Sequence, residues 1–500
     1  MHRRNFLYLT SLLGAGMLTG ANKAYSAIVG GKATKVSGKV TGKGKALKDV
    51  VVSDGFSVVK TDSKGRFEFT ASEKAGFVFV SVPAGYHIPV SKEGLAAYYQ
   101  PLEPKDAQSF NFELAPLGKD DNEHNFIIWA DPQIKNEQDA QQLLTESAPD
   151  TKALIQSYPK DTLWHGVGCG DLSWDEYDMY DDYIAAAGMT GVPFFQVIGN
   201  HDQDYRLGGD ETSDRTFKKL FGPTYYSFNR GKAHYVVLDN VYYLGKEREY
   251  KGMITDEQLA WLAKDLANVK PGSLVILCMH IPAYTEAWKR RGYEAPNIGS
   301  VTDNRDQLYA LLKNFKAHIM TGHTHFNENV QHEGVYEHIH GTVCGAWWTG
   351  SICEDGTPSG YGVYEVKGDE LKWYYKGVGK PKEYQVALYQ DEIDPANIIA
   401  NVWNYDPQWK VEFAADGKTL GSMTRFNGFD PLAVKLYKGP GMPVKRKFVE
   451  PNATDHLFKG AVPLNTKLVT VTATDRFGAV YTQTLELGAQ GQAAEKINNL

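Results

Sequence analysis

Residues 194–202 read FFQVIGNHD, and this stretch decides which fold the chain adopts. It begins with a mostly apolar run and closes on a glycine followed by asparagine, histidine and aspartate. A short apolar run that ends on glycine and polar residues predicts a buried strand that opens into a loop. The polar residues Asn200, His201 and Asp202 therefore belong at the carboxyl end of a strand, where α/β sheets bind their ligands.

Four more runs of this kind lie on either side of this stretch. Residues 125–130 lead into Asp131, residues 163–169 into Gly170 and Asp171, residues 274–279 into His280, and residues 317–321 into Gly322, His323, Thr324 and His325. Because strands of an α/β sheet open onto one crevice at their carboxyl ends, we expect these side chains to meet. Two aspartates, an asparagine and several histidines at one sheet edge predict a metal site.

The donor types indicate which metals and which chemistry to expect. Carboxylate, amide and imidazole groups together suit Zn²⁺, Mn²⁺ or iron. Asp171 is our candidate for a carboxylate that bridges two ions about 3.5–4 Å apart, and such a pair activates water and holds phosphoryl oxygens. His201 is then free to protonate a leaving oxygen, and we expect Asp202 to hydrogen-bond that imidazole and orient it.

Length, charge and cysteine content limit the possible functions. The chain of 500 residues predicts two to four domains. Its formal net charge of −7 disfavours a long nucleic acid as partner, because duplex binding requires a basic face. Four cysteines do not make a disulfide framework in a chain of this length.

The first 26 residues resemble an export signal. Arg3 and Arg4 precede an apolar stretch over residues 6–18 and a small-residue site at residues 24–26, which is typical of the twin-arginine type. We therefore predict an exported protein, periplasmic or extracellular, with no membrane span in its mature chain. The alternative is an N-terminal anchor that is not removed.

The remaining chain divides into three folded parts. Residues 28–117 and 391–488 show strand patterns broken by frequent turns, which favours two β-sandwiches. Residues 118–378 alternate strands and helices, which is typical of α/β layers. Residues 379–390 are interpreted as a linker, and residues 433–437 as one of the strand-like runs of the last part.

The order of the strand-end motifs resembles the calcineurin-like metallophosphoesterase superfamily. Gly-Asn-His-Asp at residues 199–202 followed far downstream by Gly-His-Thr-His at residues 322–325 carries this resemblance. The three-part organisation is similar to exported bacterial members with an N-terminal transthyretin-like or carboxypeptidase-regulatory-like module and a C-terminal β-rich module. The resemblance implies a four-layer αββα core flanked by two β-sandwiches. It also implies one metal held by Asp131, Asp171 and His325, and a second held by Asp171, Asn200, His280 and His323.

Two positions depart from the patterns of the superfamily. The first motif usually reads Asp-x-His, whereas Gln133 stands at its third position here, and an amide oxygen is a weaker ligand than imidazole. Branches with Asp-x-Gln exist, including ones that split nucleotide-linked diphosphates. Trp174 stands where purple acid phosphatases carry a metal-binding tyrosine, so a tyrosinate–iron site is not expected.

Residues beyond the motifs are candidates for substrate contact. Trp288, Arg290 and Arg291 follow His280, where they would grip a phosphate or the organic part of a substrate. The alternative is a solvated helix end. Trp347 lies just beyond the last ligands, where it would either form a wall of the site or pack in the core.

These observations predict a metal-dependent phosphoesterase that uses two divalent ions and a metal-bound hydroxide. Its substrate is expected to be a phosphomonoester, phosphodiester or diphosphate of a small molecule or glycan. A nuclease with the same two-metal arrangement is one alternative, which the acidic charge balance disfavours. A non-catalytic surface binding protein with a vestigial metal site is the other.

Overall fold

Two central sheets contain all five predicted strands. The computed structural model describes residues 34–205, 208–438 and 445–488, and the predicted export signal lies outside these ranges. The first sheet has the strand order β11-β10-β9-β20-β21 and the second β12-β13-β16-β17-β19-β18. Together with their helices they make a mixed α/β core, as predicted.

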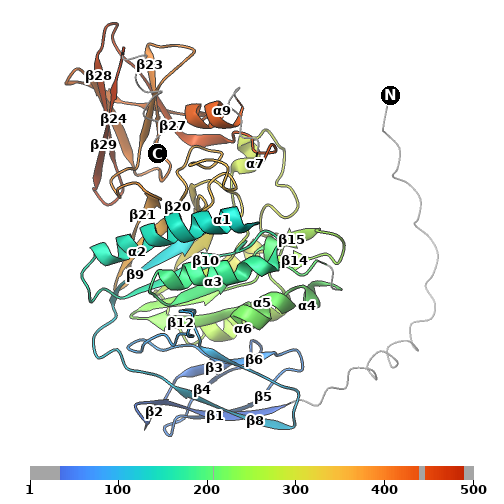
Figure 1. Ribbon diagram of the computed structural model, residues 1–500. Helices are drawn as coiled ribbons and strands as arrows, with labels where there is room; N and C mark the ends of the chain where they lie inside the picture. The colour runs from blue at the N-terminus through green and yellow to red at the C-terminus, as the bar shows by residue number, and fades with distance from the viewer. Residues whose placement is uncertain (1–33, 206–207, 439–444, 489–500) are drawn as a thin grey trace, which may run out of the picture.

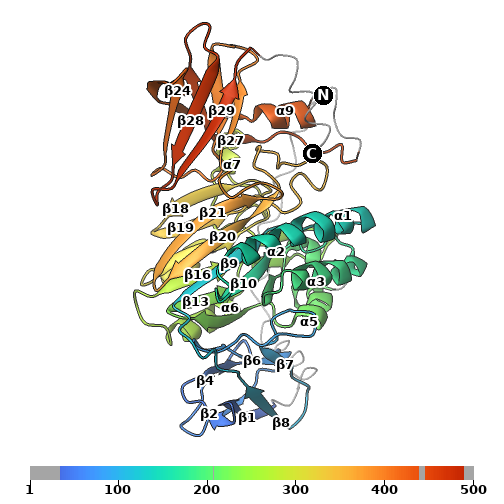
Figure 2. The ribbon, with the colours of Figure 1, turned by 60° about the vertical axis from the view of Figure 1, so that its left-hand side comes forward.

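The first sheet is parallel on one side and antiparallel on the other. Its strands are β9 (Glu123–Trp129), β10 (Trp164–Cys169), β11 (Phe194–Val197), β20 (Gly360–Lys367) and β21 (Glu370–Gly377). β9, β10 and β11 run parallel, and β20 pairs with β9 in the opposite direction. One face of this sheet packs against α1 (Glu137–Gln142), α2 (Ala148–Ser157) and α3 (Tyr180–Met189). A short π-helix, Leu143–Ser147, connects α1 to α2. These helices lie along the same side of the sheet in Figures 1 and 2.

The second sheet faces the other side of the first. Its strands are β12 (Tyr226–Arg230), β13 (Ala233–Val237), β16 (Leu274–Cys278), β17 (Lys316–Thr321), β18 (Glu328–His332) and β19 (Val335–Ile339). Phe195 of the first sheet stacks on Phe228 of the second with ring centroids 3.9 Å apart. Each such ring contributes roughly 1.5–3 kcal/mol through its burial. Because β13, β16 and β17 run parallel, the polar residues that follow β16 and β17 reach one edge.

Helices and a hairpin complete the core. Thr255 is the N-cap of α6 (Asp256–Leu266), and its hydroxyl accepts a hydrogen bond from the Gln258 backbone N–H. The other elements are α4 (Asp210–Ser213), α5 (Arg215–Phe221), α7 (Ala287–Arg290), α8 (Arg305–Leu312), and the pair β14 (Val241–Tyr243) and β15 (Tyr250–Gly252). None of the helices within the described ranges is long and apolar enough to cross a bilayer.

Two four-stranded sheets form the N-terminal part. One contains β1 (Lys35–Gly42), β2 (Lys45–Ala46), β5 (Arg66–Thr70) and β8 (Ala107–Glu113), and the other contains β3 (Val51–Ser53), β4 (Val58–Lys60), β6 (Phe77–Val80) and β7 (Tyr99–Pro101). This part lies at one end of the molecule in Figure 1. The indole N–H of Trp261 on α6 donates to the Ser53 hydroxyl at 3.1 Å and joins it to the core.

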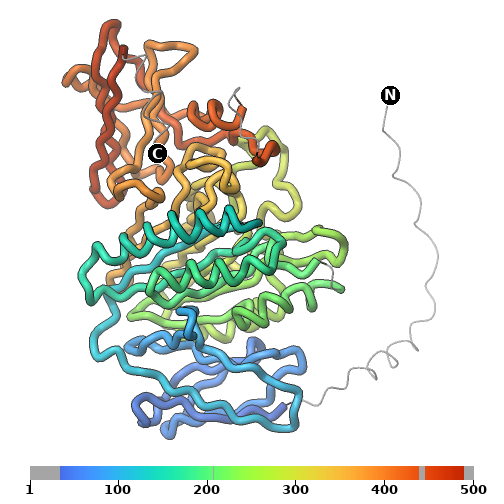
Figure 3. Tube along the Cα trace, in the orientation of Figure 1, coloured from blue at the N-terminus to red at the C-terminus, as the bar shows by residue number. Residues whose placement is uncertain are grey.

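The C-terminal part also consists of two four-stranded sheets. One contains β22 (Ala387–Gln390), β23 (Asn397–Asn401), β26 (Thr424–Phe429) and β27 (Ala453–Ala461), and the other contains β24 (Lys410–Ala415), β25 (Lys418–Ser422), β28 (Leu468–Thr474) and β29 (Val480–Glu486). The tube in Figure 3 shows that this part lies at the opposite end from the N-terminal sheets. Residues 387–390, predicted to belong to a linker, are instead a strand of this part.

The prediction of a strand over residues 433–437 is wrong. These residues lie in the helix α9 (Pro431–Tyr437). The Asp430 carboxylate accepts a hydrogen bond from the Ala433 backbone N–H at 2.8 Å. Pro431 occupies the first helical position, where its missing N–H costs nothing. The N-cap and proline together outweigh the short apolar run.

Candidate metal centre

Strained backbone positions the side chains at the sheet edge. Asp131, Gln133, Asp171, His323 and His325 all have positive φ, between 44° and 69°. Non-glycine residues adopt this conformation at a cost of roughly 1–3 kcal/mol each, and such residues cluster at functional sites. The turns aim these side chains back over the ends of their strands.

Glycines before the strand-end residues allow close approach. A Cβ atom at Gly170 would lie 2.3 Å from Nδ1 of His280, and one at Gly322 would lie 2.3 Å from a carboxylate oxygen of Asp131. A Cβ atom at Gly199 would lie 2.1 Å from the backbone nitrogen of Asp171. Only glycine therefore lets the loops of the two sheets close around the same space.

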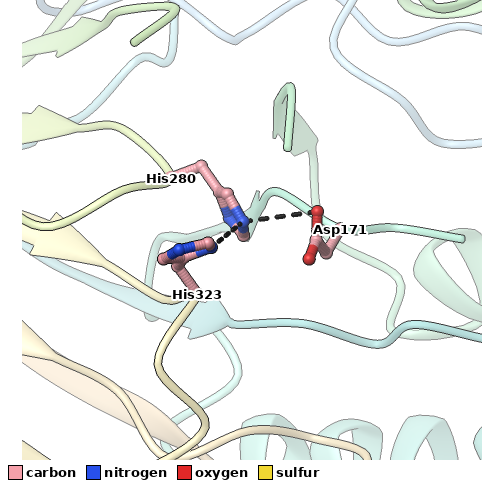
Figure 4. Close-up of side chains that lie close together, drawn as sticks. All are labelled: Asp171, His280 and His323. Atoms are coloured by element: carbon pink, nitrogen blue, oxygen red, sulfur yellow. Dashed lines mark hydrogen bonds and ion pairs between the residues drawn. The ribbon is translucent and has the colours of Figure 1, made fainter. Parts of the chain in front are cut away.

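Four donor atoms converge at the centre of this edge. Nε2 of His280 lies 3.3 Å from Oδ1 of Asp171, 3.1 Å from Oδ1 of Asn200 and 3.2 Å from Nδ1 of His323. Figure 4 shows Asp171, His280 and His323 pointing toward one another, and their donor atoms all lie within 4.8 Å. Donors about 2.0–2.1 Å from one Zn²⁺ in a tetrahedron would be roughly 3.3 Å apart. The three contacts to Nε2 of His280 therefore have the spacing of ligands around one ion.

The ring of His280 is held in the tautomer that a ligand requires. Its Nδ1 lies 2.9 Å from the backbone oxygen of Cys169, so Nδ1 carries the proton and donates it there. A bound cation would displace the proton on Nε2, whose lone pair would then face the same point as the other donors. Hydrogen bonding of the distant nitrogen is how proteins orient metal-binding histidines.

A second group of donors surrounds Asp131. Its carboxylate accepts hydrogen bonds from the backbone N–H of His323, and Oδ1 lies 3.4 Å from Nε2 of His325. The Gln133 amide donates from Nε2 to Oδ2 of Asp171 at 3.0 Å. Its Oε1 is buried and has no protein partner. A buried oxygen of this kind fits a role as an additional ligand in this group.

Charge is concentrated in this buried space. Burial opposes ionisation of Asp171, but the neighbouring histidines, His280 first, hold its pKa below the usual range. In return, although burial opposes the charged ring, Asp171 raises the pKa of His280 to about 9. Buried ionised carboxylates require positive charge or hydrogen-bond donors beside them. Divalent cations would supply it, so the donor set fits metal ions.

The predicted partner of His201 is replaced by another carboxylate. Nδ1 of His201 lies 2.9 Å from Oδ1 of Asp175. Burial lowers the pKa of His201, but the charge of Asp171 and then the bond to Asp175 raise it above its ordinary value. The Asp202 carboxylate instead accepts hydrogen bonds from the backbone N–H groups of Gly199 and Leu172 and from the Tyr180 hydroxyl. Asp202 therefore joins the loops that contain Gly199 and Leu172 and does not orient the imidazole of His201.

A cavity of about 230 Å³ opens beside His323 and His325. Trp288, Arg291 and Trp347, three of the predicted substrate residues, line it. Trp347 also stacks on His325 with ring centroids 4.1 Å apart.

Arg290, the fourth predicted substrate residue, is engaged elsewhere. Its guanidinium is buried and donates two hydrogen bonds to Glu328, at 2.8 and 3.1 Å. The prediction that Arg290 contacts substrate is inconsistent with this pairing, because its donors are directed at a protein carboxylate. No pattern in the sequence indicates this pairing, since Glu328 lies on the separate strand β18.

Sequence reasoning missed Asp175 and the C-terminal segment around Arg446. Asp175 has a φ of 56°, which turns its side chain toward His201. Arg446 is buried, and its guanidinium donates to Asp139 at 2.6 Å. Contacts of this kind depend on the tertiary fold, and no spacing in the sequence indicates them.

An α/β core with carboxylate, amide and imidazole donors at one sheet edge is a metal-binding fold. Three family sequence models match the chain: the N-terminal part of calcineurin-like phosphoesterase at residues 34–117, calcineurin-like phosphoesterase itself at 108–327, and its C-terminal part at 337–481. The chain therefore belongs to the calcineurin-like phosphoesterases, with the family's N- and C-terminal domains. No curated protein matches it significantly in sequence.

Solved structures show distant similarity. GAP50, the anchor in the inner membrane complex of Plasmodium, is 13% identical over 51% of this chain and 84% of its own, with a TM-score of 0.33. Purple acid phosphatase PPD1 from yellow lupin is 14% identical over 71% of this chain and 66% of its own, with a TM-score of 0.35. Phosphopantetheinyl hydrolase from Mycobacterium tuberculosis is 12% identical over 44% of this chain and 91% of its own, with a TM-score of 0.28.

Proposed function

We propose that the protein is a metal-dependent hydrolase of a phosphomonoester, phosphodiester or diphosphate of a small molecule or glycan. The observation that carries the proposal is the convergence of Asp171, Asn200 and His323 on Nε2 of His280, at 3.3, 3.1 and 3.2 Å. Membership of the calcineurin-like phosphoesterases supports the reaction class.

Two divalent ions, with Zn²⁺, Mn²⁺ or iron as the candidates, fit the donors. Asp171, Asn200, His280 and His323 would hold one, and Asp131, Asp171 and His325, with Gln133 beside them, would hold the other. When bound, such ions supply positive charge for the phosphoryl oxygens and lower the pKa of a water molecule. The chain itself supplies the buried carboxylates and the fixed tautomer of His280.

His201 is the proposed proton donor. The pair with Asp175 engages Nδ1 and leaves Nε2 as the nitrogen that meets the substrate. Because Asp171 and Asp175 raise the pKa of this ring, the protonated form is favoured. As the phosphorus–oxygen bond breaks, the Nε2 proton passes to the departing oxygen. Trp288, Arg291 and Trp347 would contact the substrate from the adjoining cavity.

The test compares metal-stripped protein with protein reconstituted with each ion. The substrates are p-nitrophenyl phosphate, its bis ester, a nucleotide-linked diphosphate and single-stranded DNA. We expect metal-dependent turnover of a small phosphoester and close to two ions per chain. Preferred turnover of the DNA would favour the nuclease. Less than one ion per chain together with no turnover would contradict the proposal and favour a binding protein.

The role of His201 has its own test. His201→Ala should lower turnover by about 10²-fold or more, as loss of a general acid does, while the metal content stays unchanged. His87→Ala is the control, since this histidine is exposed in the N-terminal part. Unchanged turnover in His201→Ala would remove the residue from the mechanism.

The finer architecture and location belong to the same proposal. Sheet packing through Phe195 and Phe228, with helices on the far face of the first sheet, supports a four-layer αββα core. The paired four-stranded sheets at each end support flanking sandwiches. We propose that the first is of the transthyretin-like or carboxypeptidase-regulatory-like type. We also propose twin-arginine export to the periplasm or exterior, which N-terminal sequencing of the secreted protein would test.

A further inference from the structure

Three aromatic rings from distant parts of the chain meet beside the metal centre. The rings of Trp174 and Trp347 have centroids 6.3 Å apart, and Phe448 contacts both edge-on at 5.8 and 5.1 Å. We call these three residues the aromatic shelf. Trp174 follows β10, Trp347 follows β19, and Phe448 comes from the segment that leads into β27 of the C-terminal part.

The aromatic shelf contacts the site at two places. The indole of Trp174 lies edge-on to His201 with centroids 5.9 Å apart. Trp347 stacks on His325 at 4.1 Å. The shelf therefore extends from the proposed proton donor to the donor group around Asp131, and the His201 end is where the leaving group would depart.

Phe448 is held in place although its ring is exposed. The residue as a whole is 55% exposed. Two residues earlier, Arg446 is buried and donates to Asp139 at 2.6 Å, and Lys445 donates to the same carboxylate at 2.7 Å. Single exposed aromatic residues are common, but Phe448 packs against Trp174 and Trp347, and a contiguous group of rings beside a site marks a binding surface.

We propose that the aromatic shelf binds a planar ring carried by the leaving group, so that the substrate is a nucleotide-like phosphoester. This inference rests on the proposed function, because it uses His201 to mark the leaving-group side. Stacking on an aromatic side chain suits any nucleobase, since every base has a π-face. The Lys135 ammonium and the Arg446 guanidinium lie over the Trp174 ring, 4.7 and 4.9 Å from its centroid, so the exposed Phe448 is the member of the shelf that is open for stacking.

The experiment compares two monoesters with primary-alcohol leaving groups, adenosine 5′-monophosphate and glycerol 3-phosphate. Phe448→Ala should raise KM for the adenosine ester about tenfold, as loss of one stacking contact does. It should change KM for the glycerol ester and kcat for both less than about twofold. Phe448→Tyr keeps a ring and should behave as wild type. Phe429→Ala removes a phenylalanine that is 52% exposed on β26 and serves as the matched control.

Two results would overturn the inference. One is an equal KM change for both esters in Phe448→Ala, and the other is no change for either. In both cases wild-type turnover of the esters would leave the proposed function intact. Equilibrium binding of adenosine 5′-monophosphate to metal-loaded His201→Ala and His201→Ala/Phe448→Ala supplies a readout without turnover. Binding tenfold weaker in the double variant supports the shelf, and equal binding contradicts it.

Discussion

The pair formed by Asp139 and Arg446 should control whether the segment 445–448 stays attached to the core. Asp139 is fully buried and accepts hydrogen bonds from Arg446, Lys445 and the Lys135 backbone N–H. Asp139→Ala leaves the buried Arg446 guanidinium without its carboxylate. Removal of one partner of a buried ion pair costs about 3–5 kcal/mol.

This cost should appear as local opening, because Arg446 regains hydration when the segment leaves the core. A loss of about 3 kcal/mol raises the open population roughly 100-fold, at 1.4 kcal/mol per tenfold change. Proteolysis follows that population when opening is faster than cleavage. Trypsin should therefore cut at Arg446 about 100 times faster in Asp139→Ala than in wild type, as measured by mass spectrometry of timed digests.

A matched control separates this effect from general destabilisation. Asp150 forms another largely buried ion pair, 2.8 Å from Nζ of Lys376 on β21. Asp150→Ala should lower the melting temperature without faster cleavage at Arg446. Equal cleavage rates at Arg446 in wild type and Asp139→Ala would show that the Asp139–Arg446 pair does not hold the segment 445–448 on the core.

Two further predictions concern the site glycine and a core histidine. Gly170→Ala should displace His280, because the new Cβ would lie 2.3 Å from Nδ1 of that histidine. Inductively coupled plasma mass spectrometry should then find fewer metal ions per chain than in wild type. Gly191→Ala, also at positive φ but facing open space, should keep the wild-type metal content. Burial lowers the pKa of His124 from 6.5 to about 3. The unfolded chain therefore binds a proton below pH 6.5 that the native state does not, so this histidine stabilises the fold above pH 6.5 and the contribution is lost as pH falls toward 3. Between pH 6.5 and 5 this contribution falls by about 2 kcal/mol. Urea unfolding should therefore show that His124→Asn loses about 2 kcal/mol less stability than wild type over this pH range. Identical pH dependence of the unfolding free energy in both proteins would contradict the prediction.

The strands that carry the metal donors could be predicted from the sequence. Each is a short apolar run closed by a polar residue, with a glycine between them in three of the five, and all five appear within one or two residues of the predicted bounds, as with Phe194–Val197. This pattern follows from the burial of each strand by itself, so the strands can be predicted without knowing which distant residues they contact. The order of the strand-end motifs, which resembles that of the family, then indicates which polar residues lie close together.

Partners chosen by the tertiary fold could not be predicted. Asp202 follows His201 directly, but the carboxylate that contacts the imidazole belongs to Asp175 on another loop. Arg290 follows His280 closely, yet its guanidinium binds Glu328. The error at residues 433–437 is of a different kind, since Asp430 and Pro431 are a helix-start signal that sequence analysis can use.

The pairing of β9 with β20 affects how the chain folds during synthesis. Gly362 pairs with Ile128, so the strand that ends at the first metal donor lacks one neighbour until residues 360–367 have been made. At about 5–20 residues per second, the ribosome needs on the order of ten to fifty seconds to reach them. Throughout this interval β9 has an open edge that another nascent chain can pair with. Chaperone binding to the growing chain should therefore matter most between these two strands.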